Sequence, residues 1–102
     1  MIPSKECMKN ILKYISEHAK VKVDDMAYHN IEIGSLNVST LLEQMSKEGK
    51  YTMEEIAYNF LQCYYNRLVD ANINHKDEKT IMSPTSSIVG LTLLGAEFMI
   101  QD

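Results

Sequence analysis

Residues 86–99 read SSIVGLTLLGAEFM, and within them a strand signal runs directly into a helix signal. Ile88 and Val89 are β-branched, a residue type that favours strands. Thr92 can cap a helix, and the apolar segment after it carries a glycine in its first turn. The stretch therefore predicts a strand that turns into a small closing helix.

Two helical patterns stand in the first half of the chain. Residues 5–18 repeat apolar side chains at helical spacing and follow Ser4, which can cap the helix. Residues 38–48 form a second such pattern, with Asn37 or Ser39 as the cap. Both patterns predict helices with one buried face.

A third helix is predicted from the capping box that Thr52 and Glu55 form. Its apolar arc continues to about Ala71, where we expect the helix to end. The polar residues of this helix share the opposite side, which we expect to be a solvent-facing stripe. They are Glu55, Asn59, Gln62, Asn66 and Asp70.

The segments between these helices carry strand and loop signals. In residues 19–36 valines and isoleucines alternate with charged residues, which predicts one or two short strands. Ile73 is expected to begin another short strand, followed by loop chemistry. We expect residues 80–82 and 87–91 to pair as a β-hairpin.

This order of elements predicts an α+β fold, and more specifically a winged helix-turn-helix. It comprises three helices, a β-hairpin as the wing and a short C-terminal helix. At 102 residues, without an internal repeat or a linker-like segment, the chain is expected to form one domain over residues 1–102.

Four motifs in order resemble a small winged-helix family of unknown function found in bacterial genomes and prophages. The first helix, KECMKNILKYISEH, matches the cysteine-containing opening helix of that family. The others are YTMEE at 51–55, LVDA at 68–71 and LTLLGAEF at 91–98, where Ala96 replaces the usual His. The resemblance implies the winged-helix fold and a phage or mobile-element origin, and it implies no reaction.

Charge is unevenly distributed along a chain whose formal net charge is −4. Residues 1–23 hold five lysines against two acids, whereas residues 24–71 hold three cations against eight acids. An acidic middle argues against generic phosphate binding through the central helices.

The first functional hypothesis is a DNA-binding transcriptional regulator, with a homodimer as a possible state. In a winged helix that reads DNA, the third helix enters the major groove. Asn59, Gln62 and Asn66 could then read base edges, because carboxamides pair with adenine. Candidate phosphate contacts are Arg67, Lys76 and Lys79, with Lys5, Lys9 and Lys13 as possible additions.

The alternative is a protein-binding module whose acidic face modulates or inhibits a host nucleic-acid-binding or defence protein. Glu55 and Asp70 would supply the charge, since an acidic surface complements a basic channel. Tyr58 and Tyr65, at the edge of the apolar arc, would supply amphipathic contacts of the kind enriched at protein interfaces.

The sequence does not indicate an enzyme, a cofactor or a metal site. Three histidines lie in three different segments, and neither zinc-ligand spacing nor a glycine-rich phosphate loop is present. We expect Cys7 and Cys63 to be reduced and buried. No apolar run is long enough to span a membrane, so we expect a cytoplasmic protein.

Overall fold

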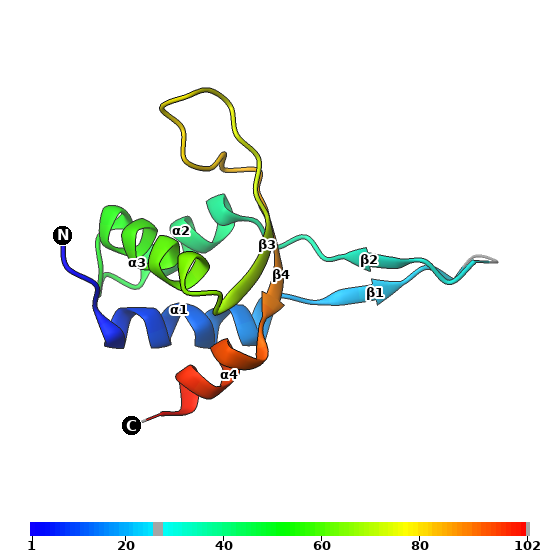
Figure 1. Ribbon diagram of the computed structural model, residues 1–102, viewed down its shortest axis with the longest axis horizontal. Coiled ribbons are helices and arrows are strands. Elements are labelled where there is room, and N and C mark those ends of the chain that lie inside the picture. Colours follow the sequence, from blue (N-terminus) through cyan, green and yellow to red (C-terminus); the bar gives the residue numbers. More distant parts are fainter. Residues whose placement is uncertain (26–27, 102) are drawn as a thin grey trace.

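The computed structural model describes residues 1–25 and 28–101, and its architecture is α+β, as predicted (Figure 1). In that part of the chain four helices accompany two small antiparallel strand pairs. The elements in order are α1 (Lys5–His18), β1 (Val21–Val23), β2 (Ile31–Ile33), α2 (Val38–Lys47), α3 (Met53–Tyr65), β3 (Val69–Asn72), β4 (Ser87–Leu91) and α4 (Leu93–Ile100).

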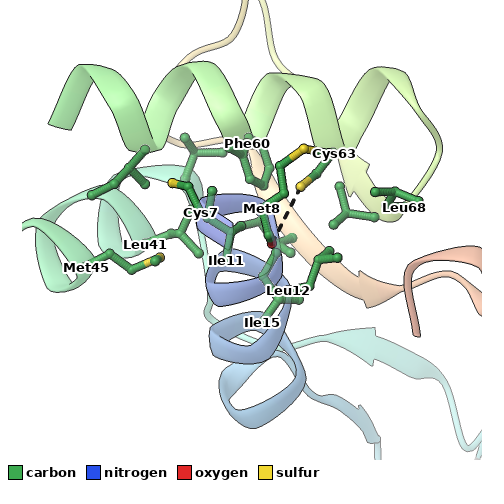
Figure 2. Packing of buried hydrophobic residues seen from close by; sticks show 14 of the residues in the cluster. Cys7, Met8, Ile11, Leu12, Ile15, Leu41, Met45, Phe60, Cys63 and Leu68 are labelled. Atoms are coloured by element: carbon green, nitrogen blue, oxygen red, sulfur yellow. Dashed lines mark hydrogen bonds between the residues drawn. The ribbon is translucent and has the colours of Figure 1, made fainter. Parts of the chain in front are cut away.

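Helix α1 is the centre of the core and lies between α3 on one side and α4 on the other (Figure 1). The face that the sequence predicted to be buried is buried, because apolar residues recur there at helical spacing. Figure 2 shows these side chains directed toward those of α2 and α3. The buried residues of α1 are Cys7, Met8, Ile11, Leu12 and Ile15.

The predicted helix starts are confirmed, and each has its cap. Ser4 accepts a hydrogen bond from the backbone of Cys7 at the start of α1. Asn37, rather than Ser39, caps α2. At α3 the Thr52 hydroxyl accepts from the Glu55 backbone while the Glu55 carboxylate accepts from Thr52, so the capping box is complete.

The predicted end of the third helix is wrong, because α3 stops at Tyr65 and not near Ala71. Arg67 adopts φ +60°, and the backbone N–H of Leu68 donates to the carbonyl of Cys63 at 2.9 Å. This is the 6→1 bond of a Schellman motif, whose left-handed position is usually glycine. Arginine at that position does not indicate the end of a helix in the sequence. Because the apolar spacing continues beyond Tyr65, it predicts a helix that is too long.

The residues after this turn form β3 rather than a last helical turn, which removes Asp70 from the predicted polar stripe. Strand β3 pairs antiparallel with β4, Val69 opposite Leu91 and Asn72 opposite Ser87. Val69 is β-branched and buried, so the extended conformation places it in the core. Sequence reasoning identified β4 correctly but paired it with the wrong segment.

Strand β4 has a neighbour on each side. Opposite β3, the backbone of Ile88 donates to Leu36 at 2.9 Å and that of Val38 donates to Ser86 at 3.0 Å. Residues 36–38 thus lie along the other edge of β4. The predicted partner of β4, residues 80–82, belongs instead to the long connection over residues 73–86, here named the β3–β4 loop. This loop is irregular because it contains residues that favour turns, namely Asp77, Ser83 and Pro84.

Strands β1 and β2, predicted only as short strands, form an arm that projects from the body (Figure 1). Val21 lies opposite Ile33, and Val23 opposite Ile31. Because directly opposed residues share a face of the pair, all four side chains lie on one side of the arm.

Helix α4 is fixed to the turn after α3 by its N-cap residue, Thr92. The Thr92 hydroxyl donates to the carbonyl of Arg67 at 2.6 Å and accepts from the backbone of Gly95 at 3.0 Å. The backbone of Thr92 donates to Leu68 at 3.1 Å. Residues 91–98 therefore have a structural role, because Thr92 binds the turn at Arg67 and Leu68 to the start of α4.

Candidate recognition surface

The outward side of α3 is a ridge of four residues at helical spacing, Glu54, Tyr58, Leu61 and Tyr65, here named the α3 ridge. It lies opposite the buried side of the helix, which contains Ile56, Phe60 and Cys63. Glu54 is exposed, Tyr65 is 59% exposed, and Tyr58 and Leu61 are half-buried.

Asn59, the central residue of the predicted base-reading set, is 4% exposed. Its carbonyl oxygen accepts from the Ser4 backbone at 2.8 Å, and its amide nitrogen donates to the Glu55 carbonyl at 2.8 Å. Both ends of the carboxamide are therefore used inside the protein. Asn59 joins the start of α1 to the middle of α3 and does not lie on the outward side.

The other predicted nucleic-acid contacts are dispersed. Gln62 is half-buried on the flank of the ridge, and Asn66 caps α3 and donates to the Gln62 carbonyl at 2.8 Å. Arg67 is exposed in the turn after α3. The structure does not bring these residues together as one row.

The predicted protein-interface residues separate in a similar way. Tyr58 and Tyr65 share the α3 ridge. Glu55 lies at the start of the helix, where its carboxylate completes the capping box. Asp70 is exposed on β3. Glu54, which the sequence analysis did not select, is the acid on the ridge itself.

The β3–β4 loop carries Lys76 and Lys79, both exposed, next to Asp77 and Glu78. The Asp77 carboxylate accepts from the backbones of Lys79 and Thr80 and from the Thr80 hydroxyl, each at 2.9 Å. These bonds hold the pKa of Asp77 below its usual value. Two acids thus offset the two lysines within this turn, which weakens the loop as a phosphate-binding element.

Two hollows flank the ridge. The first, of about 310 Å³, lies between α2, α3 and the loop. It is lined by Val38, Leu42, Ala57, Phe60, Leu61, Lys79, Ile81, Met82 and Pro84. The second, of about 700 Å³, lies between the end of α3 and the loop, and Tyr64, Tyr65 and His75 are among its lining residues. The first hollow is almost wholly apolar, with Lys79 as its one charged residue.

Lys5, Lys9 and Lys13 do not extend this surface. The Lys9 ammonium donates to the carbonyl of Gln101 just after α4, and the Lys5 ammonium lies 5.8 Å from the centre of the Phe98 ring. These contacts place Lys5 and Lys9 beside α4, and α4 and the β3–β4 loop lie on opposite sides of α1 (Figure 1). Lys13 lines a hollow between α1 and α2, together with Gln44 and Lys47.

The two thiols are buried and free, as expected. Burial raises the pKa of Cys63 to about 12 and that of Cys7 to about 11. Figure 2 shows the Cys63 sulfur directed at the carbonyl of Met8, 4.0 Å away. A protonated, buried thiol is a poor nucleophile, so this geometry describes core packing.

Metal-binding groups do not gather in the structure: across residues 1–25 and 28–101, no three His, Cys, Asp or Glu side chains are placed to share an ion. Within the same residues, every helix is too short or too polar to cross a bilayer.

Four apolar residues that line the first hollow were not predicted as site residues: Leu42, Leu61, Ile81 and Met82. The α3 ridge and this hollow are together named the recognition surface. Leu42 and Leu61 follow the helical apolar period, which predicts core-facing residues. Ile81 and Met82 carried a signal, since a pair of apolar residues stands inside an otherwise polar loop.

Comparisons of this chain with models of protein families, with curated proteins and with solved structures found no match.

Proposed function

We propose that this chain is a winged-helix domain that binds another protein through the α3 ridge and the apolar hollow beside it. The winged-helix assignment is supported by the order of the elements. The chain has the helices α1, α2 and α3, a segment at 36–38 along β4, and a long β3–β4 loop. In this arrangement, α3 is the recognition helix and the loop is the wing.

The chemistry of the α3 ridge carries the proposal. Glu54, Tyr58, Leu61 and Tyr65 include an acid, two tyrosines and a leucine, and no cation. Phosphate contacts supply much of the affinity of DNA-binding proteins, so a recognition helix with this outward face lacks the main attractive contribution. Tyrosine and leucine beside an apolar hollow suit a protein partner instead.

The partner we infer is a basic protein that offers an apolar side chain. The hollow of about 310 Å³ would accept that anchor between Leu42, Leu61 and Met82. Glu54 would face a cation at the rim, which favours basic partners over acidic ones. Nucleic-acid-binding host proteins and defence complexes have such surfaces, and the domain would modulate or inhibit them by occupying the basic site.

The experiment places a photo-crosslinking amino acid at Tyr58 in the otherwise native chain, in cells of its own host. We expect one stoichiometric adduct, identified by mass spectrometry, and binding of the purified partner that Leu61→Glu weakens at least tenfold. Ser16→Glu on the outer side of α1 is the matched control and should bind as the native chain does. No adduct, or equal loss in both variants, would contradict the proposal.

DNA binding remains a second candidate because Lys76 and Lys79 are exposed on the proposed wing. It predicts binding to duplexes from the neighbouring genome region that weakens steeply between low and physiological salt. Reversing Glu54, the acid on the α3 ridge, to lysine should strengthen such binding, whereas it should weaken contact with a basic protein. Fluorescence anisotropy of labelled duplexes across a salt series separates the two candidates. If the anisotropy shows no salt-dependent binding in any variant, DNA binding is excluded.

A further inference from the structure

The β1–β2 arm has one apolar face that nothing in the described chain covers. Val21 and Val23 are each 56% exposed, Ile31 is 77% exposed and Ile33 is 37% exposed. On the other face the Lys22 ammonium lies 3.4 Å from the Glu32 carboxylate, so that side is adapted to water. A two-stranded hairpin with three residues per strand is marginal by itself, which indicates that its apolar face has a cover.

Helix α4 shows a second uncovered apolar surface. Gly95 is buried, and Phe98 and Met99 pack against the core, yet the outer side of the same helix is also mainly apolar, with Glu97 as its charged residue. Leu93, Leu94 and Ile100 on that side are 78%, 57% and 76% exposed. So large a group of exposed apolar side chains on one short helix indicates a surface that a partner covers.

These two surfaces do not cover one another within one chain, since both remain exposed and the arm extends away from the body (Figure 1). We propose that the occupant of each is a second copy of this chain, with the arm of each copy packed on α4 of the other. Such an exchange is reciprocal and closes as a two-fold dimer. It does not rest on the proposed function.

The apolar side chains would supply most of the area that such a dimer needs. Complete burial of an aliphatic side chain removes on the order of 100 Å² from water. With the exposures given above, the seven side chains of each copy would bury on the order of 400 Å², or about 800 Å² per dimer, on that basis. This lies below the ~1,200 Å² at which stable interfaces begin, so backbone and polar neighbours at the rim would have to supply the remainder. A dimer formed only between the two arms, or only between the two α4 helices, would bury an area well below that threshold.

The dimer would leave the recognition surface open. Helix α3 lies on the side of α1 away from α4, and the arm projects sideways from the sheet, in a different direction from the β3–β4 loop (Figure 1). Each dimer would thus present two recognition surfaces. Two linked sites bind a repeated or two-fold target more tightly than either site alone.

The test compares molar mass in solution, by light scattering coupled to gel filtration, for the native chain and two double variants. The arm variant is V23K with I31K, and the helix variant is L93K with I100K. We expect the native chain to have twice the 11.7 kDa monomer mass and each variant to have the monomer mass. Ser16→Lys with Gln44→Lys adds the same charge elsewhere on the surface and should remain dimeric.

Mixing the two variants decides the arrangement. The intact arm of the helix variant can pack on the intact α4 of the arm variant, so we expect a heterodimer that is weaker than the native dimer. If arms paired with arms and α4 with α4, the mixture would stay monomeric, which overturns the proposal. A monomeric native chain, or a dimeric arm variant, also overturns it. Unchanged far-ultraviolet circular dichroism in all variants confirms that they fold.

Discussion

A β-carbon added to Gly95 would lie 1.9 Å from the carbonyl oxygen of Leu68. The two residues belong to α4 and to the turn after α3, and they meet without a side chain between them. Thr92 bonds to the same turn through its hydroxyl and its backbone. The contact explains why a glycine in the first turn of the closing helix is required by packing rather than by conformational freedom.

Gly95→Ala should therefore destabilise the protein by ~3 kcal/mol or more, because the clash is with backbone that cannot rotate away. Urea denaturation followed by circular dichroism measures the loss. Gly90→Ala is the matched control, since a β-carbon there meets no atom within 4 Å. A Gly95→Ala variant as stable as the control would show that α4 does not dock as described.

Arg67→Gly should stabilise the protein, by about 0.5–1 kcal/mol. Arginine at φ +60° bears the cost of a left-handed conformation, which exceeds the extra chain entropy that glycine loses on folding. The converse change is Gly49→Ala, at φ +78° with open space around it, which should destabilise by about 1 kcal/mol. Both values follow from denaturation midpoints, and a destabilising Arg67→Gly would indicate that the side chain makes compensating contacts.

Asn59→Ala should cost about 1–3 kcal/mol, because it removes the acceptor of the Ser4 backbone N–H in a largely buried site. Gln62→Ala, one turn away on the half-buried flank, should stay within about 0.5 kcal/mol of the native chain. Thermal melts of the two variants give the comparison. Equal stability of both would restore Asn59 as a surface residue free to contact a ligand.

The thiols of Cys7 and Cys63 should be inert toward a thiol reagent at neutral pH until the protein unfolds. Their folded pKa values, about 11 and about 12, lie above the ordinary value of 9.0. Above pH 9 the unfolded chain releases these protons and the folded chain retains them, so stability falls as pH rises. The slope approaches ~1.4 kcal/mol per pH unit for each thiol.

Two measurements check this prediction. Titration with a chromogenic disulfide should count no thiol in buffer and two in denaturant. Denaturation midpoints between pH 7 and pH 10 should fall, and a Cys63→Ala variant should show a smaller fall. Fast native labelling of either cysteine would contradict the buried placement.

The sequence was sufficient for the helix starts, because each start is a local pattern of cap and spacing that Ser4, Asn37 and Thr52 carry themselves. It was insufficient for the end of α3, because Arg67 occupies a position that glycine usually marks. Because the predicted helix continued past Arg67, it covered the residues of β3. The strand β4 was therefore paired with residues 80–82 instead. Pairing depends on tertiary contacts such as the burial of Val69, which no local pattern reveals.

The recognition surface was predictable in part. The tyrosines were selected because of their place at the edge of the apolar arc, and Tyr58 and Tyr65 do lie on the ridge. The amide stripe was selected for polarity alone, and polarity does not distinguish a solvent-facing Asn from one that bonds a backbone N–H. Asn59 is the second kind, since its partner Ser4 is 55 residues away in sequence.

The position of β4 between residues 36–38 and β3 also governs when this protein can fold during synthesis. The sheet needs segments that lie far apart in the sequence, and its middle strand is made after both of its neighbours. Until residue 91 has left the ribosome, Leu36 and Val69 lack the strand that separates them. Until β4 has emerged, the apolar side chains of Leu36 and Val69 thus stay open to chaperones.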